Sequence, residues 1–136
     1  HAEYIYYNKF LFKKFFNDIL NITSKSGFEV FHKRKRVMGD YVNYSYKNLM
    51  INLQKNNNFH SLDPNINAQD LIKNASAVIA SPFTSVPYIA KIMNKPCIYY
   101  DPVNYVFKND ANSNNIKIIS GVNELSKWFK TIDKYN

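Results

Sequence analysis

The apolar residues near the start of the chain recur at helical spacing. Between residues 8 and 24 they mostly fall three or four positions apart, which predicts an amphipathic helix with a wide apolar face. Gly27 suits the residue after this helix, because glycine readily adopts the left-handed conformation common there. Residues 28–31 then alternate apolar and polar side chains, which predicts a short strand.

Further along the chain, short continuous apolar runs alternate with helical patterns. The runs at 77–80 and 97–100 have the length of strands and no polar interruption, which is typical of strands buried on both faces. The expected helices cover residues 8–24, 40–54, 68–74, 85–93 and 123–134, and the expected strands cover 28–31, 59–62, 77–80, 97–100 and 116–119.

This alternation predicts the fold class: an α/β, three-layer Rossmann-like domain with a mainly parallel sheet and helices on both faces. Ligands of such domains bind at the carboxyl ends of the strands. Those ends fall at residues 32–36, 63, 81–85 and 101–102, which carry most of the polar chemistry of the sequence. Candidate site residues are therefore sought there.

Composition narrows the functional classes. The chain has 136 residues, 46% of them hydrophobic, which is enough for one domain and too few for two. One cysteine and three scattered histidines exclude a disulfide scaffold and argue against a metal site. The three glycines never form a Gly-x-Gly group, which excludes the dinucleotide fingerprint and the Walker loop. No apolar run reaches the roughly 18–20 residues that span a bilayer.

The strongest local signal for binding is the segment at 81–85, Ser-Pro-Phe-Thr-Ser. The hydroxyls of Ser81, Thr84 and Ser85 surround an expected strand-to-helix turn, where free N–H groups and the helix dipole favour a phosphate or diphosphate. The alternative is that Thr84 or Ser85 simply caps the helix.

The second signal is the basic run Lys33, Arg34, Lys35 and Arg36, which contains both arginines of a chain with net charge +8. Arginine binds phosphate oxygens in a planar fork that lysine cannot copy, so this run is a second candidate phosphate contact. A solvated basic loop and a nucleic-acid patch stay open as alternatives.

Two aspartates are candidate contacts for a ribose or a sugar hydroxyl. Asp101 ends an expected buried strand, and Asp110 lies in a long Asn-rich loop. A turn acceptor and a solvated loop charge are the respective alternatives. The sequence contains no paired carboxylates at helical spacing and no nucleophile–histidine pair, so it indicates a binding site and leaves the catalytic residues unknown.

The segment at 70–102 resembles the donor-side half of GT-B glycosyltransferases, and more narrowly bacterial proteins of capsule or lipopolysaccharide biosynthesis. In those proteins a Pro-Phe-Thr-Ser turn precedes a helix, a Gly-Lys-Pro turn and a Tyr-Tyr-Asp-Pro strand end. This chain has Pro-Phe-Thr-Ser at 82–85 and Tyr-Tyr-Asp-Pro at 99–102, and Asn94 replaces the glycine before Lys-Pro. The stretch at 118–125 and the position of the basic run also match.

The resemblance implies that residues 3–136 form the C-terminal, donor-nucleotide domain of a longer glycosyltransferase. It implies a nucleotide-sugar substrate, no cofactor, a glycan acceptor and a separate N-terminal domain. Because the chain begins with His1 and not with methionine, we expect residues 1–2 to be a tag remnant or the point where a longer chain was cut. The sequence shows no signal peptide and no membrane-spanning run, so we expect a cytoplasmic location, peripheral to the inner face of the membrane. Because it shows no RNP, KH or helix-turn-helix pattern, we expect no specific nucleic-acid partner. On its own the fragment is expected to bind nucleotide weakly and to be inactive.

Two alternatives to the glycosyltransferase interpretation stay open. One is a basic α/β module that binds RNA or another polyanion, as the sequence pI of about 9.5 allows. The other is a non-catalytic interaction domain that docks through Tyr4, Tyr6 and Tyr7.

Overall fold

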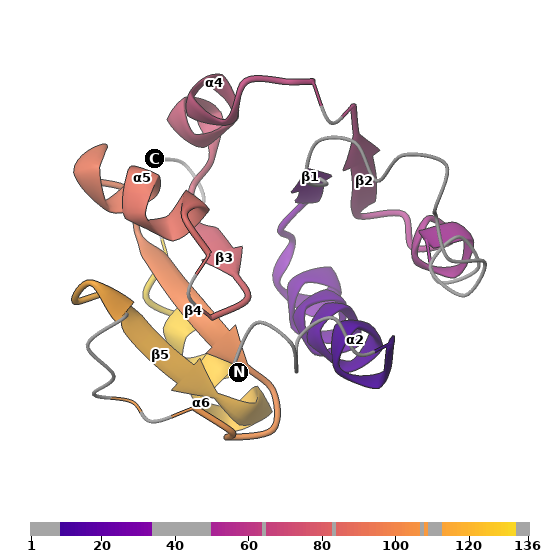
Figure 1. The fold of residues 1–136 in the computed structure, drawn as a ribbon. Helices are drawn as coiled ribbons and strands as arrows, with labels where there is room; N and C mark the ends of the chain where they lie inside the picture. Colours follow the sequence, from indigo (N-terminus) through magenta and orange to yellow (C-terminus); the bar gives the residue numbers. More distant parts are fainter. Residues whose placement is uncertain are drawn as a thin grey trace.

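Strands and helices alternate along the chain, as the hydrophobic pattern predicts (Figure 1). The computed structural model describes residues 9–33, 50–63, 65–82, 84–106, 108 and 113–132. The elements are α2 (Lys9–Ser26), β1 (Val30–Lys33), β2 (Phe59–Leu62), α4 (Ala68–Asn74), β3 (Val78–Ala80), α5 (Val86–Ile92), β4 (Cys97–Asp101), β5 (Lys117–Ser120) and α6 (Gly121–Phe129). Residues 50–53 are helical as well, and the rest of the helix expected over 40–54 lies outside the described residues.

The strands form two small parallel sheets. One pairs β1 with β2, with Val30 opposite Phe59, and the other has the order β3-β4-β5, with Ala80 opposite Tyr99 and Asp101 opposite Ser120. The prediction of parallel strands with interleaved helices is confirmed. The prediction of one Rossmann-like sheet is wrong, because no ladder joins the two sheets among the described residues.

The side chains of β1 differ from those of a strand in the middle of a parallel sheet. Strands in the middle of a parallel sheet are buried on both faces. Phe31 of β1 is instead 53% exposed, and its ring stacks on His60 of β2 with 4.9 Å between ring centroids. His60 in turn lies 2.9 Å from the Glu29 carboxylate. One face of the β1-β2 pair therefore carries an exposed aromatic ring next to a polar pair.

Both sheets nevertheless contribute to one core beneath them. Phe16 and Leu20 of α2, Phe59 of β2, Tyr100 of β4 and Leu125 of α6 belong to the same buried cluster. A second cluster, built from Ile72, Val78 and Ala90, packs α4 and α5 against the opposite face of the three-stranded sheet. The expectation of helices on both faces is thus confirmed for this sheet.

The two sheets lie with β1 on the side of the larger sheet (Figure 1). In Figure 1, β1 lies between β2 and the three-stranded sheet, so the chain first moves outward to β2 and then returns to build β3, β4 and β5 on the other side. In α/β folds, ligands bind at the carboxyl ends of the parallel strands. The turn at 81–85 follows β3 at such an end, whereas the residues directly after Lys33 of β1 lie outside the described part of the chain.

Local signals set several element ends. Gly27, with φ 77°, follows α2 as predicted, and the Asn67 side chain caps α4 by accepting the Gln69 N–H at 2.8 Å. The predicted bounds of the last helix are wrong, since α6 starts at Gly121 and ends at Phe129. Among the described residues, no helix combines the length and apolarity needed to cross a membrane.

Candidate functional site

Polar groups gather where the three strands of the larger sheet end. Because β3, β4 and β5 are parallel and in register, their carboxyl ends lie at one edge, the carboxyl edge. The turn at 81–85 follows β3, Pro102 follows β4, and Ser120 ends β5 directly before α6. The candidate site residues of all three strands therefore share this edge of the sheet.

The turn after β3 is held in place by two hydrogen bonds. Thr84 Oγ1 donates to the Ser81 carbonyl at 2.9 Å, and the Tyr99 hydroxyl of β4 donates to the Thr84 carbonyl at 2.7 Å. Burial raises the pKa of Tyr99, so its hydroxyl stays a proton donor at neutral pH. The turn is thereby fixed to the neighbouring strand.

The hydroxyls of this turn do not cap the helix that follows it. Ser85 occupies the N-cap position of α5, yet its side chain makes no capping hydrogen bond, and the Thr84 hydroxyl is directed to Ser81. The capping alternative is therefore wrong for both residues. Ser85 is exposed, so its hydroxyl is available for a hydrogen bond to a ligand.

Asp101 is fully buried at the end of β4 and organises the next loop. Its carboxylate accepts backbone N–H groups from Val103 at 3.2 Å, Tyr105 at 2.6 Å and Val106 at 2.7 Å. These bonds match the alternative of a turn acceptor. The contact of Asp101 with a ribose or sugar stays a prediction.

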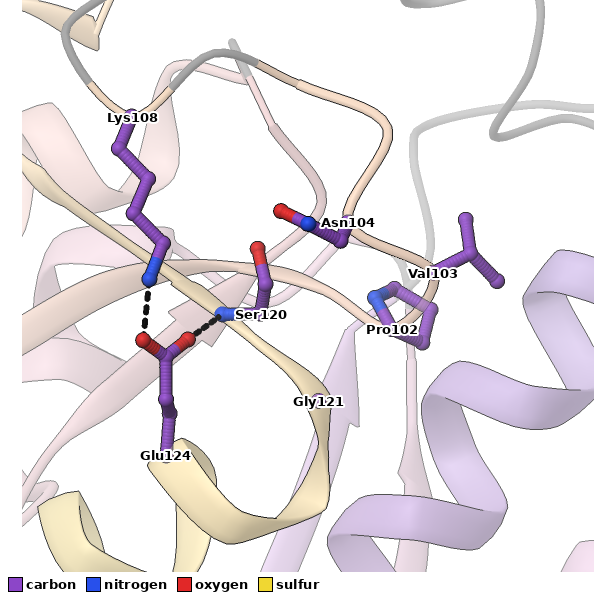
Figure 2. A pocket seen from close by; sticks show the side chains of 7 residues that line it. All are labelled: Pro102, Val103, Asn104, Lys108, Ser120, Gly121 and Glu124. Carbon is purple, nitrogen blue, oxygen red and sulfur yellow. Dashed lines mark hydrogen bonds and ion pairs between the residues drawn. The ribbon is translucent and has the colours of Figure 1, made fainter.

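A pocket of about 440 Å³ opens between the loop after β4 and the start of α6 (Figure 2). Its lining residues combine charged, polar and apolar groups: Pro102, Val103, Asn104, Lys108, Ser120, Gly121 and Glu124. Figure 2 shows Lys108 and Glu124 meeting on one side, and Pro102 and Val103 on the other.

Glu124, in the first turn of α6, is fixed by two donors. Lys108 forms an ion pair with one carboxylate oxygen, and the Ser120 N–H donates to the other at 2.6 Å. The bond from Lys108 and then that from Ser120 hold the pKa of Glu124 below its usual value, so the side chain is ionised at neutral pH. The Ser120 hydroxyl oxygen is buried and has no hydrogen-bond partner in the described part of the chain.

The structure brings some of the predicted site residues together and leaves others apart. Ser81, Thr84 and Ser85 lie in the turn after β3, Asp101 ends β4, and Lys33 is the last residue of β1. Neither the turn at 81–85 nor Lys33 lines the pocket. Arg34, Lys35, Arg36 and Asp110 lie outside the described residues, so their roles stay predictions.

Sequence reasoning missed the two charged residues of the pocket. Glu124 follows Ser120 by four residues at a helix start, an arrangement close to a capping box that could have drawn attention to it. Lys108 lies in a long polar loop and carries no such signal. Within the described ranges, no group of three or more His, Cys, Asp or Glu side chains could hold a metal ion.

These features define an α/β protein with parallel strands whose polar residues collect at the carboxyl edge of its larger sheet. The chain belongs to the family described as polysaccharide biosynthesis PFTS motif protein, whose model matches residues 1–129. Residues 82–85 spell that motif, Pro-Phe-Thr-Ser, in the turn after β3. Its family assigns the chain a role in polysaccharide biosynthesis. Searches of curated proteins and of solved structures gave no match.

Proposed function

We propose that this chain is the donor-binding half of a glycosyltransferase that uses a nucleotide-sugar to build a bacterial surface polysaccharide. The observation that carries the proposal is the position of the PFTS turn. The residues that name the family follow β3 at the carboxyl edge, and α/β proteins bind ligands at the carboxyl ends of their parallel strands.

Two segments of the chain carry groups that suit a diphosphate. The turn after β3 offers the uncommitted Ser85 hydroxyl next to the first N–H groups of α5. The basic run at 33–36 begins with Lys33, the last residue of β1, and its sequence holds both arginines of the chain. Arginine pairs with phosphate oxygens through two parallel N–H bonds, which makes it the better phosphate ligand of the two basic residues.

This arrangement fits the chemistry of glycosyl transfer. The reaction breaks the bond between the anomeric carbon of the sugar and a phosphate oxygen, and negative charge develops on the departing nucleotide. Donors fixed before the reaction stabilise such charge best, because they need not reorganise when it forms. In this proposal the glycan acceptor and the base that deprotonates it belong to a second domain, and the assembly works at a membrane surface.

Isothermal titration with UDP, CMP, CDP and GDP tests the donor-site proposal. We expect one of the four to bind, and Ser85→Ala to weaken that binding about tenfold, as expected for one lost bond to a charged group. The variant should fold normally, because the Ser85 hydroxyl does not cap α5.

Ser24→Ala is the matched control, since Ser24 is an exposed serine of α2 far along the chain from the carboxyl edge. Binding of none of the four nucleotides would overturn the proposal. RNA binding that falls steeply with salt, without nucleotide binding, would favour the polyanion-binding alternative.

A further inference from the structure

The pocket between the loop after β4 and α6 differs in charge from the proposed phosphate contacts. Its two ionised groups, Lys108 and Glu124, form an ion pair and cancel each other. A phosphate placed there would be attracted by the Lys108 ammonium group but repelled by the Glu124 carboxylate. The lining therefore favours a neutral ligand over a free anion.

The hydrogen-bonding capacity of the pocket suits hydroxyl groups. A carboxylate can accept about four hydrogen bonds, and Glu124 receives one at each oxygen from the protein. Lys108 has three N–H donors, of which the ion pair uses one. Glu124 can thus accept hydrogen bonds from adjacent hydroxyls of a ligand, while Lys108 donates a hydrogen bond to one of these hydroxyls.

Ser120 adds a third polar contact to the same wall. Its hydroxyl oxygen is buried and has no partner in the part of the chain that the structure describes. Figure 2 shows the Ser120 hydroxyl and the Asn104 amide directed toward the same space. Buried hydroxyls in native proteins are nearly always hydrogen-bonded, so a ligand or a bound water is expected to complete this one.

The remaining walls leave room for a ring with an apolar face. Pro102 is buried, and Val103 stands beside it on the side of the pocket opposite Glu124. A Cβ atom built on Gly121 meets no other atom within 4 Å, so the space next to this residue is open. A volume of about 440 Å³ is of the size that small-molecule sites in proteins have.

We propose that this pocket binds a neutral sugar ring through two adjacent hydroxyls, with Glu124 as acceptor and Lys108 and Ser120 as donors. The ring is either the ribose of the nucleotide or a pyranose of the polysaccharide. If the ring is a ribose, the inference rests on the proposed function. If the ring is a pyranose, the inference rests on the membership of the chain in a polysaccharide-biosynthesis family.

Amide chemical shifts of the ¹⁵N-labelled chain test this proposal with four probes: uridine, 2′-deoxyuridine, methyl glucoside and inorganic diphosphate. We expect uridine or methyl glucoside to move the amide signals of Asn104, Ser120 and Gly121, and the responding probe identifies the source of the ring. If uridine responds, 2′-deoxyuridine should bind at least about tenfold more weakly, because it lacks the adjacent hydroxyl pair.

Variants of the pocket separate ring binding from a general change in the fold. Glu124→Gln should weaken ring binding at least about tenfold, because it removes the charge that strengthens the hydrogen bonds from the hydroxyls. Asp70→Asn, an exposed acidic residue of α4, is the matched control and should bind as the parent does. If Glu124→Gln perturbs the whole amide spectrum, Lys108→Gln replaces it, with Lys55→Gln as its control.

The outcomes distinguish this proposal from the donor-site proposal. Absence of shifts with every ring probe would overturn the sugar pocket even if nucleotides bind. Shifts of the three pocket amides with diphosphate alone would also overturn it, because the pocket would then be an anion site. Ring binding in a chain that binds no nucleotide would support the sugar pocket and remove the donor-site proposal.

Discussion

Several buried polar side chains in the described part of the chain hydrogen-bond to specific partners. Tyr100 of β4 is fully buried, and its hydroxyl donates to the Asp18 carboxylate of α2 at 2.8 Å. Lys14, one turn earlier on α2, lies 3.3 Å from the same carboxylate. Burial, and then the bond to Asp18, raise the pKa of Tyr100 far above its ordinary value, so the hydroxyl remains a donor. One hydrogen bond thus joins α2 to β4, the central strand of the larger sheet.

Glu124 makes the folding stability of the protein depend on pH. Its pKa in the folded protein lies below the ordinary value of 4.5, so its contribution to stability is present above about pH 4.5 and is lost as the pH falls through the folded value. We expect Glu124→Gln to lower the free energy of unfolding at pH 7 by at most about 1 kcal/mol, because the pair with Lys108 is half-exposed.

Urea unfolding of the parent and of Glu124→Gln at pH 7 and pH 3 measures this contribution. The difference between the two proteins should shrink at pH 3, and it should also shrink when salt is added at pH 7. A difference that is the same at both pH values would contradict the assignment of the charge to Glu124.

At the scale of elements, the end of α5 depends on a left-handed residue. Asn94 has φ 60°, and the Lys95 N–H bonds to the Ala90 carbonyl at 2.9 Å, the long bond that closes a helix in the Schellman motif. Asparagine is one of the few residues other than glycine that adopt this conformation readily. This explains how Asn94 can stand where the resemblance has glycine.

Substitution at Asn94 tests this explanation of the helix end. Asn94→Ala should lower the free energy of unfolding by about 1 kcal/mol, whereas Asn94→Gly should leave it unchanged or raise it slightly. Thermal and urea unfolding of both variants measure the two effects. An alanine variant as stable as the parent would show that the conformation at this position carries no strain.

The loop after β4 depends on Asp101 in the same way. Three backbone N–H groups donate to this buried carboxylate, and the loop that it holds provides Pro102, Val103 and Asn104 to the pocket. We expect Asp101→Ala to cost more than about 2 kcal/mol of stability, since hydrogen bonds to a charged group are lost together. The same variant should lose ring binding in the pocket.

Asp101→Asn keeps the shape of the side chain and separates these effects. Its amide offers one oxygen in place of two, so stability should fall between that of the parent and that of Asp101→Ala. Urea unfolding midpoints give the order of the three proteins. If Asp101→Ala unfolds at the parent's midpoint, the carboxylate does not hold the loop.

At the scale of the whole molecule, local patterns predicted the elements better than their assembly. Apolar spacing and turn residues act over a few positions, which is why the helices and strands lie close to where the sequence placed them. The division into two sheets is a non-local result. It depends on which strands pair along their edges, and neither this pairing nor the stacking of Phe31 of β1 on His60 of β2 could be foreseen from a strand-like pattern alone.

The residues of the site also differ in whether the sequence predicts them. The strand ends pointed to the turn at 81–85 and to Asp101, because ligand positions follow from the direction of parallel strands. The pocket itself joins Lys108 to Glu124, which are brought together by the loop that Asp101 holds and by the start of α6. Contacts of that kind arise only once the chain has folded, so no spacing in the sequence encodes them.

The most direct measurement of the central claim is an amide shift map of the ¹⁵N-labelled chain with the nucleotide that binds best. We predict that shifted residues cluster at the carboxyl edge, in the turn at 81–85 and around Ser120 and Gly121, while the opposite ends of the strands, near Cys97 and Lys117, stay unchanged. No shifts, or shifts spread over exposed lysines away from this edge, would contradict it.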